Sequence, residues 1–259
     1  MGHLRLGSLP DTAPWRQVVQ LLAEGADVSE VVIATTEAAL EGLDRAHDDD
    51  GLAYTVWLLA QTVLASRSKN FSGALASVGV HTVSEPDVFD IAAGFTEAVD
   101  RHLLEGKSRT DLGEIAQLAG VETLSAQLAR RSANLFETTH TEVQAAAREC
   151  STQKGFADLA HNFFACFARR FLTYHLSREL SNHVGGNGCF AEPEEHSAYL
   201  DKLDIHCREV AGVARRYAGE WYSKTNFEGG ITPSKARRFA NHVLKKLRDG
   251  LLVREARHG

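Results

Sequence analysis

Apolar residues recur every three or four positions along most of this chain, which is the spacing that favours helices. In the densest stretch, Phe156, Phe163, Phe167 and Phe171 fall on one helical face. The long Val, Ile and Thr alternations that predict strands are missing. We therefore predict an all-α protein, a single globular domain of about eight to ten helices around a central aromatic helix at residues 155–184.

The same periodicity predicts helices on both sides of that element. They are expected at residues 15–25, 29–43, 52–65, 71–78, 84–106, 112–136, 142–150, 192–222 and 233–256. Boundary signals are Ser29 as an N-cap, Ser84 with Pro86 as a helix start, and Thr232 with Pro233 as N-cap and first helical residue. The inner side of the 192–222 helix is expected to carry Leu200, Leu203, Ile205, Val210, Val213 and Tyr217.

Composition points to a folded protein of the cytoplasm. A chain of 259 residues that is 44% hydrophobic can bury a substantial core. The most apolar window, residues 52–65, is shorter than the roughly 20 apolar residues needed to cross a bilayer, so we read it as a buried helix. Residues 1–14 lack the apolar core of a signal peptide, and the four cysteines are then expected to be reduced thiols.

The net charge of −6 conceals a split between the two halves of the domain. Residues 1–105 have 16 acidic and 6 basic side chains, whereas residues 106–259 have 18 acidic and 22 basic ones. The N-terminal half is therefore acidic and the C-terminal half mildly basic. Such an asymmetry can guide association with a partner protein or a second copy, within a screening length of about 8 Å.

Residues 110–130, TDLGEIAQLAGVETLSAQLAR, partly match a DNA-binding helix-turn-helix. Ile115 and Gly120 sit where the first helix and the turn would place them. In the segment after Gly120, the positions that would dock the second helix on the first hold only alanines. That segment has no basic residue before Arg130. Because DNA phosphates are neutralised by Lys and Arg, we favour an ordinary core helix here.

The stretch Asn182 to Cys189, NHVGGNGC, resembles the loop of Fic-type nucleotidyl-transferring enzymes, which combines a histidine, a Gly-Asn-Gly turn and a following arginine. His183 stands two residues too near Gly186, and Cys189 takes the arginine position, so the charge that would hold a phosphate is missing. A glycine-rich helix end explains the same residues.

Residue spacing disfavours a metal site. His47 and Asp48 form the dipeptide of HD-type hydrolases, but only His3 precedes them, and the aspartates at 48–50 lack a second acidic motif. Solvated aspartates at a helix N-terminus explain that run better. No Cys or His pair has zinc-ligand spacing. We expect no metal, no cofactor and no catalytic residue, although a Cys/His nucleophile pair could still meet in space.

Arg170, Tyr174 and Arg178 form one stripe of the central helix, beside its phenylalanine faces. A guanidinium group removed from water needs a carboxylate, a phosphate or several carbonyls. Two interpretations stay open. The stripe pairs with acids on neighbouring helices, or it forms an anion-binding or partner-binding site.

The final helix is amphipathic, with an apolar face and basic residues around it. In one interpretation it is a capped surface helix whose basic end complements the helix dipole. In the other, Lys235, Arg238, Lys245 and Lys246 contact nucleic acid. Membrane binding is disfavoured, because the apolar face is needed to cover the core and lacks Trp.

Residues 163–185 and 221–236 look like parts of uncharacterised all-helical proteins of bacterial genomes, from defence-associated gene clusters. The resemblance brings no catalytic residue and implies a subunit that acts beside other proteins. With the charge split, it predicts a non-enzymatic interaction or accessory subunit of a bacterial multi-protein assembly, in antiviral defence. The alternatives are a nucleic-acid-binding accessory protein, and a hydrolase or transferase whose site is assembled from residues distant in sequence.

Overall fold

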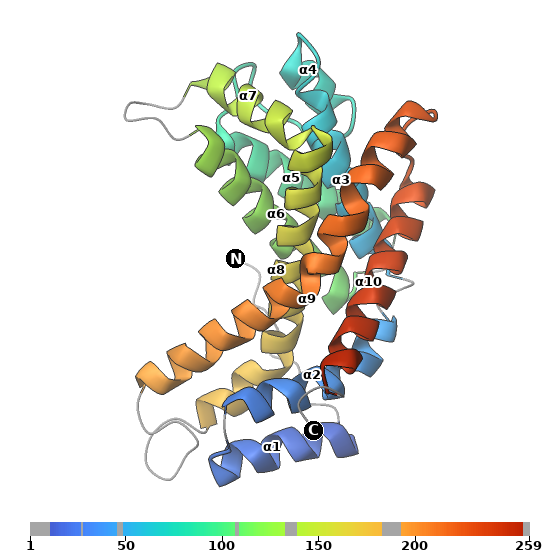
Figure 1. The fold of residues 1–259 in the computed structure, drawn as a ribbon. Coiled ribbons are helices and arrows are strands. Elements are labelled where there is room, and N and C mark those ends of the chain that lie inside the picture. Colours follow the sequence, from blue (N-terminus) through green and yellow to red (C-terminus); the bar gives the residue numbers. More distant parts are fainter. Residues whose placement is uncertain are drawn as a thin grey trace.

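The computed structural model describes residues 11–26, 28–45, 49–106, 109–132, 139–182 and 193–255. Over these ranges the chain is all-α, with ten helices and no strand, as the periodicity predicted. The helices are α1 (Ala13–Glu24), α2 (Val28–Arg45), α3 (Asp50–Ala65), α4 (Phe71–Ala76), α5 (Val88–Glu105), α6 (Asp111–Ser132), α7 (His140–Cys150), α8 (Gln153–Asn182), α9 (Pro193–Phe227) and α10 (Pro233–Glu255) (Figure 1).

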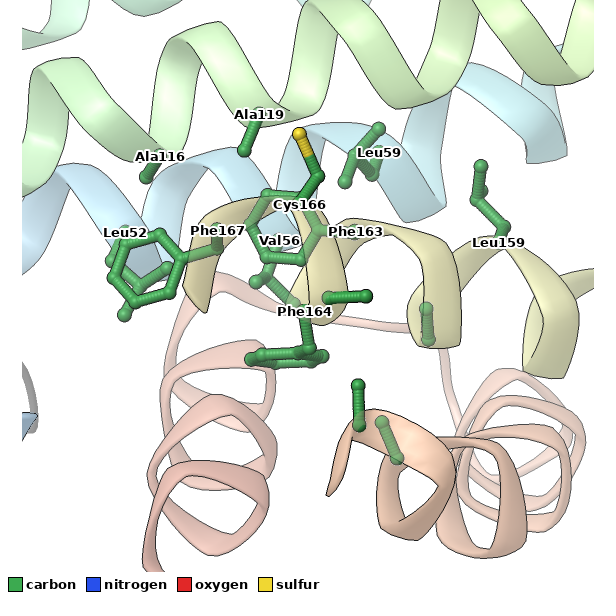
Figure 2. Packing of buried hydrophobic residues seen from close by; sticks show 14 of the residues in the cluster. Leu52, Val56, Leu59, Ala116, Ala119, Leu159, Phe163, Phe164, Cys166 and Phe167 are labelled. Carbon is green, nitrogen blue, oxygen red and sulfur yellow. The ribbon is translucent and has the colours of Figure 1, made fainter. Parts of the chain in front are cut away.

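Helix α8 lies at the centre of the fold, as predicted for the aromatic segment. Its inner side chains Phe163, Phe164 and Phe167 are buried between α3, α6 and the α9–α10 pair (Figure 2). Helix α3, which contains the most apolar window, is buried along most of its length, as expected. No helix within the described ranges is both long and apolar enough to cross a membrane.

Several helix boundaries follow the predicted signals. Gly25 ends α1 with φ 68°, a left-handed conformation that glycine adopts without steric cost. At the start of α10, the Thr232 hydroxyl accepts a 3.3 Å hydrogen bond from the Lys235 amide, and Pro233 is the first helical residue. The N-cap of the last helix is therefore confirmed.

Several predicted boundaries are wrong. The helix predicted to end at residue 222 continues to Phe227 as α9. Ser29 does not cap α2, because that helix already begins at Val28. Helix α5 begins at Val88 rather than near Ser84, because Asp87 and Asp90 form a reciprocal capping box: each carboxylate accepts a hydrogen bond from the backbone amide of the other.

The long helices α8 and α9 run side by side and approach closely near Gly219. A Cβ atom at Gly219 would lie 2.7 Å from the Gln153 carbonyl oxygen, so this helix pair depends on the missing side chain. Two stacked pairs follow: Phe156 lies on Tyr222 with ring centroids 4.1 Å apart, and Trp221 lies on Phe239 of α10 at the same separation. Aromatic contacts thus join α8, α9 and α10.

The predicted inner side of α9 is only partly right. Leu203 and Val213 are buried, but Ile205 is 57% exposed and Tyr217 is 44% exposed. The buried residues of α9 include the large Tyr199 and Tyr222 and also the small Cys207, Ala211, Ala214 and Ala218. Small side chains let two helix backbones approach closely, so the size of an apolar residue does not by itself mark the buried face here.

Candidate functional site

The polar stripe of α8 pairs with acids of helix α6. The Arg170 Nε and Nη2 atoms donate hydrogen bonds of 2.9 and 2.5 Å to Glu122 Oε2. The Tyr174 hydroxyl donates a 2.8 Å hydrogen bond to Asp111 Oδ2. Arg178 lies in α8, and its side chain is outside the described part of the chain. For the first two residues, the structure has the acid pairing that was one of the two interpretations.

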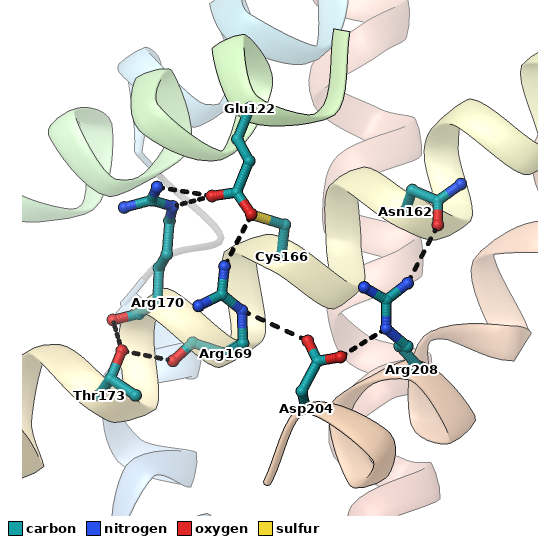
Figure 3. Close-up of polar contacts among 8 residues, drawn as sticks. All are labelled: Glu122, Asn162, Cys166, Arg169, Arg170, Thr173, Asp204 and Arg208. Atoms are coloured by element: carbon teal, nitrogen blue, oxygen red, sulfur yellow. Dashed lines mark hydrogen bonds and ion pairs between the residues drawn. The ribbon is translucent and has the colours of Figure 1, made fainter. Parts of the chain in front are cut away.

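The pairing extends into a chain of ion pairs that joins α6, α8 and α9, which we call the ion-pair ladder (Figure 3). Arg169 Nη2 lies 2.8 Å from Glu122 Oε1, and Arg169 Nε lies 3.3 Å from Asp204 Oδ1. Asp204 Oδ2 in turn lies 2.6 Å from Arg208 Nε. The ladder residues are Glu122, Arg169, Arg170, Asp204 and Arg208.

Sequence reasoning found Arg170 but missed Arg169, Glu122 and Asp204. The Arg169–Arg170 dipeptide was a usable signal, because guanidinium groups on a core helix need carboxylates nearby. Nothing in the sequence identified which acids these are. The two acids and three arginines of the ladder leave an excess of one positive charge, so binding of an anion there stays a prediction.

The ladder lowers the pKa of Glu122 below its ordinary value. Burial by itself would raise that pKa, but hydrogen bonds from Arg170 and Cys166 and the charges of both arginines outweigh it. The carboxylate therefore stays ionised near neutral pH. The neighbouring Cys166 thiol has a raised pKa, first because it is buried and second because it faces the Glu122 charge.

The three described cysteines have the properties of structural thiols. Burial raises the pKa of Cys150 and Cys166, and it raises that of Cys207 to about 12. A thiol with a raised pKa has little of the nucleophilic thiolate form at neutral pH. None of these three cysteines thus has the properties of a Cys/His nucleophile.

The two aspartates at the start of α3, Asp49 and Asp50, hold helices together. The Asp49 carboxylate caps α3 by accepting a 2.8 Å hydrogen bond from the Leu52 amide, as expected, and it also accepts a 2.5 Å bond from Thr110. Asp50 is not a free solvated carboxylate, contrary to expectation. It pairs with His102 Nε2 at 2.6 Å and with Arg237, which joins α3 to α5 and α10.

The remaining motifs give no further site. Helix α6 runs without a break through Gly120, whose missing Cβ makes room for Thr55 and Phe95, so the segment is the ordinary core helix that we favoured over a helix-turn-helix. The dipeptide His47–Asp48 and the Fic-like loop after Asn182 lie outside the described residues. No group of three or more His, Cys, Asp or Glu residues suited to a metal ion occurs in the described ranges.

The four basic residues of α10 that were predicted to contact nucleic acid differ in their surroundings. Lys235 forms internal hydrogen bonds: its Nζ donates to the carbonyls of Glu228 (3.3 Å) and Gly230 (2.9 Å). Lys246 is partly buried. Arg238 and Lys245 are exposed and form no ion pair within the part of the chain that the structure describes. Nucleic-acid contact by these four residues stays a prediction.

The turn between α9 and α10 is anchored to α3 and follows an exposed aromatic side chain at the end of α9. Phe227 at its start is 91% exposed. A few residues on, the carbonyl of Ile231 accepts two hydrogen bonds from α3, from Trp57 Nε1 at 3.1 Å and from Gln61 Nε2 at 2.8 Å. No periodic pattern could have shown this anchoring, because it joins residues about 170 positions apart.

Comparison of the chain with family models, with curated proteins and with solved structures finds no match.

Proposed function

We propose that this protein is a non-enzymatic, helical protein-binding subunit of a multi-protein assembly, and that the α9–α10 turn, residues 227–231, makes contact with the partner. The observation that carries the proposal is Phe227, whose side chain is 91% exposed on an anchored turn. Burying a phenylalanine side chain that is exposed to water is favourable by about 1.5–3 kcal/mol. Contact with a partner protein would supply that burial.

The anchoring of the turn supports a binding role. Ile231 is fixed by Trp57 and Gln61, and the Lys235 Nζ joins the two carbonyls of Glu228 and Gly230. A loop that is already ordered loses less conformational entropy on association than a flexible one. Aromatic residues, phenylalanine included, are enriched at protein interfaces relative to the rest of the surface.

The kind of assembly is proposed from the resemblance alone. Segments 163–185 and 221–236 look like parts of helical proteins from bacterial defence-associated gene clusters, and the second of these segments includes the anchored turn. The partner we expect is therefore a protein encoded by a flanking gene.

The test is size-exclusion chromatography with light scattering, for the protein alone and mixed with the products of the flanking genes. We expect a complex that Phe227→Ala weakens at least tenfold without changing thermal unfolding. Val83→Ala is the matched control, because Val83 is 56% exposed at a different place. A stable monomer that binds none of these products would overturn the proposal, and so would equal binding by Phe227→Ala.

A further inference from the structure

The outer face of the α9–α10 pair is a second candidate binding surface, and it does not depend on the protein contact proposed above. We infer that the outer face of the α9–α10 pair binds single-stranded nucleic acid. We call this face the basic strip and define it by Tyr217 and Lys224 of α9 and Arg238, His242 and Lys245 of α10. The C-terminal part of α9 runs beside α10 on the right-hand side of the molecule in Figure 1.

The cations Lys224, Arg238 and Lys245 of the basic strip have no ion-pair partner among the described residues. All three are exposed, and their side chains form no hydrogen bond within the described ranges. On the α6–α8–α9 side, in contrast, Arg169, Arg170, Arg208 and Arg215 are each paired with a carboxylate. Unpaired cations on one face attract a polyanion without first breaking an internal ion pair.

The geometry of the strip fits a phosphate chain. On α10, His242 and Lys245 lie four and seven residues beyond Arg238, so all three occupy one helical face. Arg238 and Lys245 are then about 10 Å apart along the helix, at 1.5 Å per residue. That length corresponds to roughly three nucleotides of one strand at about 3.4 Å each.

An aromatic side chain lies among these cations. Tyr217 is 44% exposed and meets His242 edge to face, with ring centroids 5.0 Å apart at 85°. One turn further along α9, Trp221 stacks on Phe239 and fixes the spacing of the two helices. Cations for phosphates beside an exposed ring for base stacking are the combination found in single-strand binding surfaces. This ring favours nucleic acid over an acidic protein as the ligand.

One acid lies next to the strip. Glu220 is exposed on α9, one turn from both Tyr217 and Lys224, and forms no ion pair with a described residue. It repels phosphates, so its removal gives a variant with the opposite expected effect. Glu220→Gln should tighten binding about two- to threefold, the change expected from one weak surface charge interaction.

The experiment measures binding of fluorescent 20-nucleotide DNA and RNA strands to the full-length protein by anisotropy between about 50 and 200 mM salt. Three phosphate contacts to a single strand predict a log–log salt slope of about −2. Reversal of the strip by K224E/R238E/K245E should abolish binding, and Tyr217→Ala should weaken it roughly tenfold, as loss of stacking does. The control K69E/K154E/K202E makes the same charge change at exposed lysines outside the strip and should bind as the wild type does.

Three results would overturn the inference. The first is no binding at low salt, and the second is equal loss of binding in the strip reversal and in the control. The third is competition by polyglutamate as effective as that by unlabelled oligonucleotide, with Tyr217→Ala unchanged, which would assign the strip to an acidic protein. Circular dichroism of every variant separates loss of binding from loss of folding.

Discussion

Arg170 of α8 and Glu122 of α6 are 48 residues apart in sequence, and two guanidinium nitrogens of Arg170 donate hydrogen bonds to one carboxylate oxygen of Glu122. Arg169 contacts the other oxygen of the same carboxylate. Glu122 therefore ties the central helix to α6, as Asp111 does through the Tyr174 hydroxyl. The first predictions test this relationship.

Glu122→Gln should destabilise the protein. The substitution removes the negative charge from two arginines, and because all three side chains are partly exposed, we expect a loss of about 0.5–1 kcal/mol in the free energy of unfolding. Urea denaturation at neutral pH measures it. Glu97→Gln is the control, since Glu97 is exposed on α5 and should change stability very little. Equal stabilities of the two variants would contradict a structural role for the ladder.

The contribution of Glu122 should depend on pH. Its pKa in the folded protein lies below the ordinary value of 4.5, so the ionised form stabilises the fold above about pH 4.5, and this stabilisation is lost as the pH falls through the folded-state pKa. The difference in unfolding free energy between wild type and Glu122→Gln should be constant from about pH 7 to 5 and shrink below that. If the difference in unfolding free energy stayed the same in strong acid, the ionised Glu122 carboxylate would not be its source.

Replacing two of the glycines by alanine should change the stability of the protein in opposite directions. A Cβ at Gly155 would lie 2.0 Å from the Glu149 carbonyl oxygen and 2.8 Å from Cys150 Cα, so Gly155→Ala should destabilise by about 1–3 kcal/mol or more. A Cβ at Gly212 would meet nothing within 4 Å, and Gly212→Ala should stabilise α9 by about 0.8–1 kcal/mol. Thermal unfolding of both variants checks the pair.

Asp49 should be needed for both α3 and α6. Asp49→Ala removes the cap of Leu52 and leaves the Thr110 hydroxyl without its acceptor, and we expect a loss of about 1–2 kcal/mol. Asp49→Asn keeps an oxygen for the cap and should lose less. Equilibrium unfolding in urea compares the two, and equal losses would show that the N-cap hydrogen bond contributes little.

The described cysteines should be unreactive in the folded protein. Cys150, Cys166 and Cys207 are buried and have raised pKa values, so in a Cys189→Ser variant a thiol reagent such as DTNB should react slowly near pH 8. Unfolding in guanidinium should release all three thiols at once. A fast-reacting thiol in the native variant would reveal an activated cysteine.

Local sequence was sufficient to predict most of the helices, because apolar periodicity, proline and glycine act within a few residues of where they stand. The start of α10 at Thr232 and Pro233 and the end of α1 at Gly25 are such cases. The same reasoning failed at Ser84, because a competing capping box at Asp87 satisfies two backbone amides where Ser84 would satisfy one.

The sequence alone determined the helical class, the aromatic segment at the centre of the core, and the need of Arg170 and Tyr174 for polar partners. Only the tertiary structure decided which acids pair with Arg169 and Arg170, that Ile205, Tyr217 and Phe227 face solvent, and that Trp57 and Gln61 hold the Ile231 turn. The reason is physical: periodicity shows which side of a helix is apolar, whereas contacts between helices depend on how closely their backbones approach. In this protein that approach is set by small residues such as Gly219 and Ala218, which carry almost no hydrophobic signal.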